Sequence, residues 1–234
     1  MDDIQKTKKH CLDKLDLKNA KLSNEYYYSS LPLCVIDSVF SIGVKYQGVK
    51  NTINRICEYY SIEQFYDKKL EIPVRKNQKA TSYFITLFEN ADLDSLVLKV
   101  FRNRQRTSVK NGILKVKAVI KFLKVLKEFK IEYFQDIQKV IGNHEFEKAI
   151  KDIPGQRSGI SLKYFYMLTG SENDIKPDRM IMRFLYDATD NNFNIEQCQN
   201  IIISVVKELN KDGYELTPKL LDNIIWNYQR NKKS

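Results

Sequence analysis

The sequence has few of the residue types that carry metal or redox chemistry. Its four cysteines, Cys11, Cys34, Cys57 and Cys198, show no CxxC spacing, and it contains only two histidines. This scatter argues against a disulfide framework, a zinc site and an iron–sulfur cluster. We therefore expect no metal and no cofactor, and a reducing, cytoplasmic setting.

Long apolar runs are also missing. No run reaches membrane-spanning length, and the segment MDDIQKTKKHCLDKLDLK is charged throughout, without the apolar stretch of a secretory signal. We expect no membrane partner.

Glycine and proline are scarce, at 8 and 5 of 234 residues, and strand-type alternation of polar and apolar residues is rare. Apolar residues instead recur at steps of three and four, a pattern that predicts an all-α fold. The expected helices cover part of 1–25, two segments of 31–60 broken near Gln47-Gly48, short pieces of 80–100, a long helix from Ile113, and 132–141, 144–152, 180–189, 194–210 and 217–229. A loop is expected over 66–79.

The chain carries a net charge of +10 and has a pI near 9.2. Such a charge suits a polyanionic partner, because Lys and Arg neutralise phosphates. A lysine-rich composition without any partner explains the charge equally well.

The most informative stretch is Ile153–Arg183, IPGQRSGISLKYFYMLTGSENDIKPDRMIMR. It predicts a tight hairpin, an apolar helix, a polar loop and then Pro-Asp-Arg. The hairpin can present backbone N–H groups at a helix N-terminus, where a phosphate binds well. Asp178 follows nineteen positions after Gly159. A phosphate anchor and one placed carboxylate are what a base-excising DNA enzyme needs.

These residues resemble the signature of the helix-hairpin-helix (HhH-GPD) DNA glycosylase superfamily, whose hairpins read like PGVGxK before VDxHxxR. Leu31–Ile56 looks like the family's early helix pair, and Gly112–Leu126 like the helix that precedes its hairpin. The resemblance implies two interleaved helical subdomains with a DNA-binding cleft between them. Because the first residues of the chain are polar, we expect an N-terminal arm or helix over 1–30, followed by a single unit over 31–234. Within that unit lie the hairpin at 153–160, a catalytic loop at 171–179 and C-terminal helices over 180–230.

The sequence departs from the family pattern at several positions. Members that cleave the DNA strand have a lysine at the end of the hairpin, where this chain has Gly159. Arg157 replaces the middle glycine, Met180 the histidine after the aspartate, and Pro177 a usual valine. The resemblance therefore implies a monofunctional enzyme without lyase activity.

Asp178 is the expected catalytic residue. A carboxylate beside the deoxyribose stabilises the cation that forms as the N-glycosidic bond breaks, and it can orient or deprotonate the attacking water. The alternative is that Asp178 caps the following helix, since Pro-Asp before an apolar run is a common helix start. Both roles can coexist.

Other site residues are expected from the resemblance and from side-chain chemistry. Phosphate contacts are expected from Gly155, Gln156, Arg157, Ser158 and Gly159. A base pocket or strand wedge is expected from Asp37, Ser38, Ser41, Lys45 and Tyr46, and stacking on a flipped base from the run Tyr26–Tyr28. DNA-backbone contacts are expected from Arg102, Arg104 and Arg106. Each set has a plainer alternative, namely local backbone hydrogen bonds, aromatic packing or a solvated surface.

The sequence thus predicts a monomeric, monofunctional DNA N-glycosylase that acts on double-stranded DNA. Its substrate is a repair lesion such as an alkylated purine, or a modified base of phage DNA removed in antiviral defence. A binding module of the same fold, without catalysis, is the alternative. A helical protein-interaction domain is a third possibility.

Overall fold

The structure, a computed structural model, describes residues 2–232. Over that range the chain forms helices and loops and no β-strand, with two isolated bridges, Tyr28–Phe65 and Arg106–Leu114. The all-α prediction is confirmed. No helix in the same range is long and apolar enough to cross a membrane. The chain divides into two compact units, one of them formed by two separate segments.

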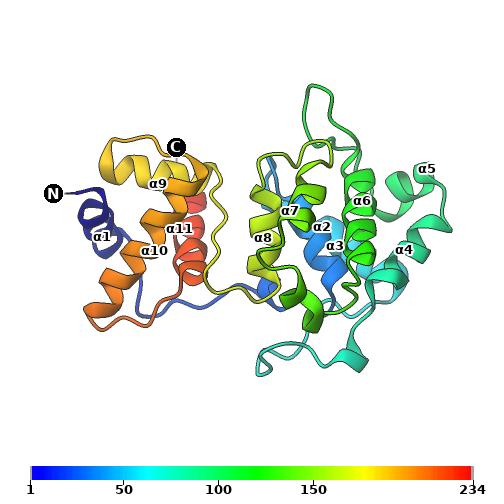
Figure 1. Cartoon of the computed structure of the whole chain (residues 1–234), viewed down its shortest axis with the longest axis horizontal. Helices are drawn as coiled ribbons and strands as arrows, with labels where there is room; N and C mark the ends of the chain where they lie inside the picture. Colours follow the sequence, from blue (N-terminus) through cyan, green and yellow to red (C-terminus); the bar gives the residue numbers. More distant parts are fainter. Residues whose placement is uncertain (1, 233–234) are drawn as a thin grey trace. The chain divides into compact units, whose positions relative to one another are not determined.

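The first unit, which we call the central unit, is continuous and covers Asn24–Thr169. Its elements are η1 (Asn24–Tyr27), α2 (Leu31–Phe40), α3 (Tyr46–Tyr60), η2 (Arg75–Asn77), α4 (Thr81–Glu89), α5 (Leu93–Ser95), η3 (Leu96–Val100), α6 (Lys115–Glu128), η4 (Phe134–Lys139), α7 (His144–Lys151) and α8 (Ile160–Leu168). Every residue of α2 is buried, and α2 packs against α3, α6 and α8. This helix forms the centre of the unit (Figure 1).

The break between α2 and α3 lies at Ser41–Lys45 and not near Gln47-Gly48, where the sequence predicted it. Gly43 makes the turn with φ +71°, a backbone conformation that glycine adopts at little cost. Gly48 instead lies in the first turn of α3, and its N–H donates to the carbonyl of Lys45. Gly43 therefore forms the turn between the two helices, whereas Gly48 is an ordinary helical residue.

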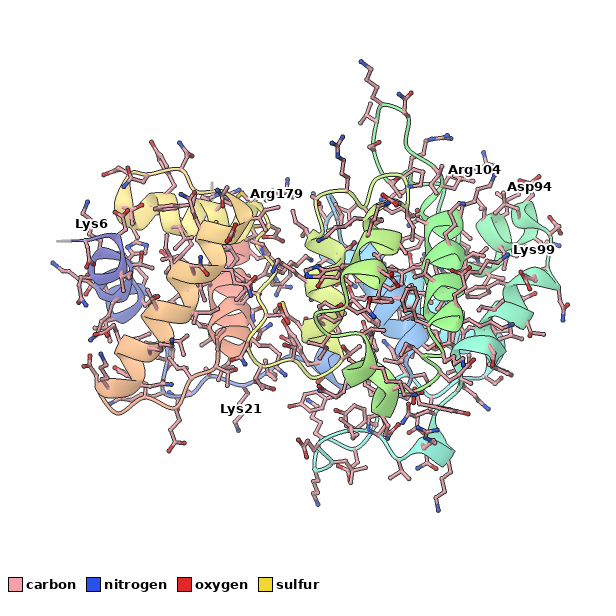
Figure 2. The ribbon with its side chains drawn as sticks, in the orientation of Figure 1. Lys6, Lys21, Asp94, Lys99, Arg104 and Arg179 are labelled. Carbon is pink, nitrogen blue, oxygen red and sulfur yellow. The ribbon has the colours of Figure 1, made fainter. Side chains whose placement is uncertain are left out.

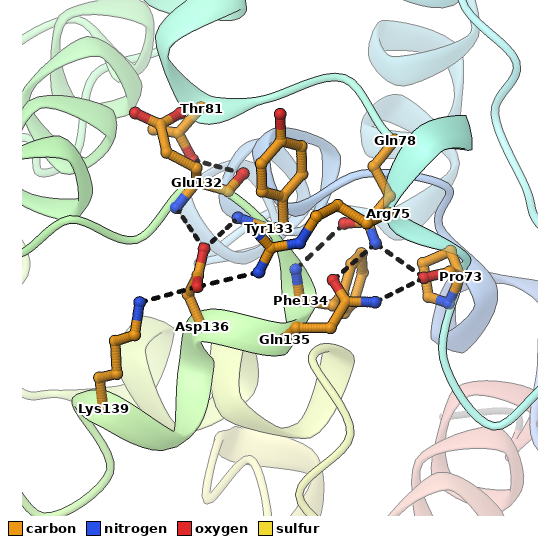
Figure 3. A network of polar contacts seen from close by, with 10 residues as sticks. All are labelled: Pro73, Arg75, Gln78, Thr81, Glu132, Tyr133, Phe134, Gln135, Asp136 and Lys139. Carbon is orange, nitrogen blue, oxygen red and sulfur yellow. Dashed lines mark hydrogen bonds and ion pairs between the residues drawn. The ribbon is translucent and has the colours of Figure 1, made fainter.

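The predicted loop around Pro73 is held in place by a polar network (Figure 3). The side-chain amide of Gln78 donates to the carbonyl of Pro73 at 2.7 Å, and its oxygen accepts from the Phe134 N–H at 3.0 Å. Arg75 reaches Asp136 at 3.3 Å and stacks over Tyr133. Because these contacts tie the loop to η4, the segment is fixed although it has little secondary structure.

The second unit, which we call the terminal unit, joins Met1–Ser23 to Gly170–Ser234. Its helices are α1 (Asp3–Lys14), α9 (Arg179–Thr189), α10 (Ile195–Lys211) and α11 (Pro218–Asn231). Thr217 caps α11 through a hydrogen bond from the Leu220 N–H, with Pro218 at the first helical position, as the sequence predicted.

The division of the chain differs from the predicted N-terminal arm followed by one unit over 31–234. Helix α1 packs against α9 and α10, and Cys11 and Leu17 join Phe184 and Val205 in one buried apolar cluster. The N-terminal segment is too polar to reveal this packing by its own periodicity. The helices over 180–230 therefore share a core with the N-terminus.

Two element boundaries also differ from the predictions. The segment predicted as a helix over 132–141 is a shorter 3₁₀ helix, η4, whose first turn is fixed by Asp136. The long helix α6 begins at Lys115, because residues up to Leu114 belong to the preceding loop.

Candidate functional site

The tight hairpin predicted over Pro154–Gly159 is a turn between two helices of the central unit. Helix α7 ends at Lys151, α8 begins at Ile160, and the two helices pack together. Gly155 has φ +88° and Gly159 has φ +73°, so both lie in the left-handed region that favours glycine. Gly159 directly precedes α8, which places the turn at a helix N-terminus, where backbone N–H groups attract anions.

The side chains of the turn divide into structural and exposed ones. Gln156 is buried and accepts a hydrogen bond from the hydroxyl of Ser161, so it holds the turn onto α8. Ser158 accepts from the Ile160 N–H at 3.4 Å, as a weak cap. Arg157 is exposed and adds a positive charge beside the helix N-terminus. The N–H groups of Gln156 and Gly159 donate to carbonyls within the turn, so Arg157 is the exposed charged group that the turn presents.

Asp178 lies in the terminal unit and is the N-cap of α9. One carboxylate oxygen accepts from the Met180 N–H at 2.8 Å, which confirms the predicted cap. The other oxygen lies 3.9 Å from the ammonium of Lys176, and the side chain is 20% exposed. A partly exposed carboxylate fixed by a backbone bond can stabilise a neighbouring cation. The cap therefore does not compete with the expected catalytic role.

A second carboxyl group, Asp222 of α11, supports the backbone before Asp178. It is buried and accepts from the Lys176 N–H at 2.9 Å. Burial and the nearby charge of Asp178 raise the pKa of Asp222 well above its ordinary value. Neighbouring carboxyl groups, one of them with a raised pKa, are typical of functional sites.

Two lysines lie in or beside the loop that leads to Asp178. Lys176 and Lys219 are both nearly buried, and Lys219 forms an ion pair with Glu172. The backbone N–H of Lys219 also donates to the carbonyl of Glu172 at 3.1 Å. The loop that leads to Asp178 is thus tied to α11 at both of its ends, by Glu172 and by Lys176.

Asp37 is fully buried in α2, among tyrosines of the central unit. One carboxylate oxygen accepts from the phenols of Tyr46 at 2.7 Å, Tyr28 at 2.9 Å and Tyr164 at 3.4 Å. Burial first, and then the charge of Asp37, raise the pKa of all three phenols well above the ordinary value. We call these four residues the Asp37 cluster. It brings three phenols around one carboxylate in the buried interior of the central unit.

The remaining pocket candidates have different surroundings. The hydroxyl of Ser38 donates to the Val35 carbonyl at 3.0 Å, and that of Ser41 to the Ser38 carbonyl at 3.3 Å, which matches the predicted local alternative. Tyr46 is buried and its phenol donates to Asp37, so its side chain does not protrude as a strand wedge would. Lys45 is exposed just before α3.

The predicted DNA-backbone residues lie on the loop between η3 and α6. Arg102 and Arg104 are exposed, while the guanidinium of Arg106 donates to the Gly112 carbonyl at 2.8 Å. The hairpin, this loop and the Asp37 cluster belong to the central unit, and Asp178 belongs to the terminal unit.

Asp222 and Tyr164 were not predicted from the sequence. The helical periodicity could have predicted that Asp222 is buried, because it lies on the same face of α11 as Pro218, Leu221 and Ile225. Tyr164 lies within the apolar segment ISLKYFYML and gave no signal. Among residues 2–232 no group of three or more His, Cys, Asp or Glu residues could hold a metal ion.

The structure therefore defines an all-α chain with a tight turn between α7 and α8 and a capped, partly exposed aspartate. The chain belongs to the family described as Domain of unknown function (DUF8548), whose model matches residues 5–230. No curated protein and no solved structure matches the chain.

Proposed function

We propose that this chain is a monofunctional DNA N-glycosylase. Such an enzyme extrudes a damaged or modified base from the duplex, hydrolyses its N-glycosidic bond and leaves an abasic site. The observation that carries the proposal is the turn between α7 and α8, with Gly155 and Gly159 in left-handed backbone directly before a helix N-terminus. The proposal includes the cleft between two helical subdomains that the family resemblance implies.

Asp178 is the proposed catalytic group. The hydrogen bond from the Met180 N–H fixes one of its oxygens, so the carboxylate has a defined orientation. It stabilises the positive charge that develops on the deoxyribose and directs water to the sugar. Gly159 offers no amine at the end of the hairpin, so we propose hydrolysis by water without a covalent intermediate at that position.

The Asp37 cluster favours an alkylated purine as the substrate. Alkylation at a ring nitrogen gives the base a positive charge, which a buried carboxylate attracts, and tyrosine rings stack on its face. A bulky modified base of phage DNA is the second candidate substrate, and it would need a roomier, more polar pocket. The first substrate assigns the protein to DNA repair and the second to antiviral defence.

A non-catalytic module that binds DNA structure is the alternative function. The specific observations in its favour are the absence of a lysine at Gly159 and the presence of Met180 where the resembled family has a histidine. Both readings require DNA binding through the hairpin. They differ in whether a base is released.

The test is to incubate the purified chain with three kinds of double-stranded DNA: unmodified, treated with a methylating agent, and carrying enlarged pyrimidines from phage genomes. Mass spectrometry measures released bases, and alkali treatment reveals abasic sites. We expect release of methylated purines, with strand breaks that appear only after alkali.

Asp178→Asn is the decisive variant, because asparagine keeps the acceptor for the cap and removes the charge. We expect it to lower the excision rate by a factor on the order of a hundred to ten thousand. Asp190→Asn, at the opposite end of the same helix, is the matched control and should retain full activity. Excision that survives Asp178→Asn would remove this residue from its role. DNA binding without any base release would support the binding module.

A further inference from the structure

The positive charge of the chain is concentrated in one segment. Residues 95–127 contain ten Lys and Arg residues and no Asp or Glu. The basic residues are Lys99, Arg102, Arg104, Arg106, Lys110, Lys115, Lys117, Lys121, Lys124 and Lys127. Figure 2 labels Lys99 and Arg104 among them. The loop over residues 102–112 lies in the middle of this segment and rises from the body of the central unit, between η3 and α6 (Figure 1).

Hydrogen bonds within the loop give it a defined conformation. The Thr107 N–H donates to the Ile113 carbonyl, and the Lys115 N–H to the Gln105 carbonyl, both at 2.8 Å, so the two arms of the loop pair like a short hairpin. The hydroxyl of Ser108 donates to the Lys110 carbonyl at 2.7 Å across the tip. These bonds hold the tip away from the core in a defined shape.

The loop also packs directly on the predicted phosphate-binding turn. A Cβ added at Gly155 would lie 2.3 Å from the Cβ of Thr107, so only a glycine permits this approach. The arms of the loop and the turn before α8 therefore belong to one surface of the central unit. A DNA backbone bound at the turn would run beside the loop.

The tip of the loop carries a fully exposed apolar side chain, Val109, next to the exposed Lys110. This valine packs against nothing in the unit, so the fold itself does not require an apolar residue there. Proteins that open a duplex insert apolar side chains between base steps and hold the flanking phosphates with basic residues. The tip has both components.

We propose that residues 102–112 are a DNA-probing loop, in which Arg102, Arg104 and Lys110 bind phosphates and Val109 enters the base stack at a weakened step. The inference rests on the DNA binding contained in the proposed function, and it adds a residue that fills the space left by an extruded base. The ligand is a DNA duplex with a locally unstable step.

The experiment compares Val109→Ser with Val74→Ser, a matched control at another exposed valine of the central unit. Binding is measured on a matched duplex and on one with a central mismatch beside 2-aminopurine, whose fluorescence rises when the base unstacks. We expect Val109→Ser to bind the matched duplex as the wild type does. On the mismatched duplex it should lose affinity by on the order of tenfold and lose the fluorescence rise. Val74→Ser should change neither.

Arg104→Ala tests the phosphate contacts separately. We expect weaker binding to both duplexes and a salt slope reduced by about one. Val109 lies at an exposed tip, so its substitution should leave the thermal unfolding midpoint unchanged, and a loss of signal cannot be attributed to unfolding.

The outcomes separate this inference from the glycosylase proposal. If no base is released but the fluorescence rise depends on Val109, the result supports the loop proposal and contradicts the glycosylase proposal. If bases are released and Val109→Ser changes neither fluorescence nor mismatch affinity, the loop proposal is overturned and the glycosylase stands. A chain that binds no DNA overturns both, and a tip that captures a protein in place of DNA overturns the loop proposal.

Discussion

Asp136 in the central unit and Asp222 in the terminal unit are both nearly buried carboxyl groups, yet their pKa values move in opposite directions. Burial alone would raise the pKa of Asp136, but hydrogen bonds from Lys139 and from the N–H groups of Glu132 and Tyr133 lower it. Asp222 accepts from the Lys176 N–H and lies near the charge of Asp178, and its pKa rises.

The comparison shows that the hydrogen-bond partners and neighbouring charges of a buried carboxyl group determine the direction of its pKa shift more than the extent of its burial does. Asp136 is surrounded by donors and serves to join η4 to the Pro73 loop. Asp222 is placed beside another carboxylate, an arrangement that costs stability and is typical of functional sites. Three substitutions test this difference.

The largest effect is expected for Asp136→Ala. The substitution leaves the N–H groups of Glu132 and Tyr133 without their acceptor and removes the partner of Arg75 and Lys139. We expect the free energy of unfolding, measured in urea, to fall by about 2–4 kcal/mol. Asp152→Ala removes an exposed ion pair from the same unit and should change little. Equal effects of the two substitutions would contradict the structural role of Asp136.

A smaller effect, with a pH dependence of opposite sign, is expected for Asp222→Asn. Because the folded pKa of Asp222 is raised, its stabilising contribution is complete below the unfolded pKa of about 3.9 and is lost as pH rises through the folded pKa. Asparagine keeps the acceptor for Lys176. The variant should therefore gain on the order of 1 kcal/mol relative to wild type near pH 7.

The measurement for Asp222 is a series of urea unfolding curves between about pH 4 and pH 8. The difference in stability between variant and wild type should grow with pH. The lowered pKa of Asp136 predicts the reverse, a contribution present above about pH 3.9 and lost as pH falls through the folded value. Parallel curves for wild type and Asp222→Asn would show that Asp222 does not titrate as described.

The smallest effect is expected for Arg75→Ala. Its guanidinium reaches Asp136 at 3.3 Å and stacks on Tyr133, but the side chain is 55% exposed. Solvent screens such a pair, so we expect a loss of no more than about 1 kcal/mol in the same urea assay. A loss as large as that of Asp136→Ala would mean that the ion pair, and not the backbone N–H bonds, holds the network together.

The helices and their start signals could be predicted from the sequence because those signals are local. Thr217-Pro218 and Asp178 each cap the helix that follows, and each cap depends on residues within three positions. The break after α2 was placed wrongly because Gly48 and Gly43 look alike in sequence, and only the packing of α3 decides which one turns the chain.

The candidate site was less predictable because its contacts are distant in sequence. Asp37 was singled out as a polar residue in an apolar helix, but Tyr164 lies 127 positions away and carried no signal. The union of α1 with α9 and α10 joins the two ends of the sequence, and local periodicity contains no information about such pairs.

That union also determines the order in which the protein can complete its fold. During synthesis α1 is made more than 160 residues before α9. Its apolar face, with Cys11 buried in the finished unit, must wait in contact with water or with a chaperone while the central unit forms. The terminal unit, and the Asp178 loop with it, can become native only after α11 has been released.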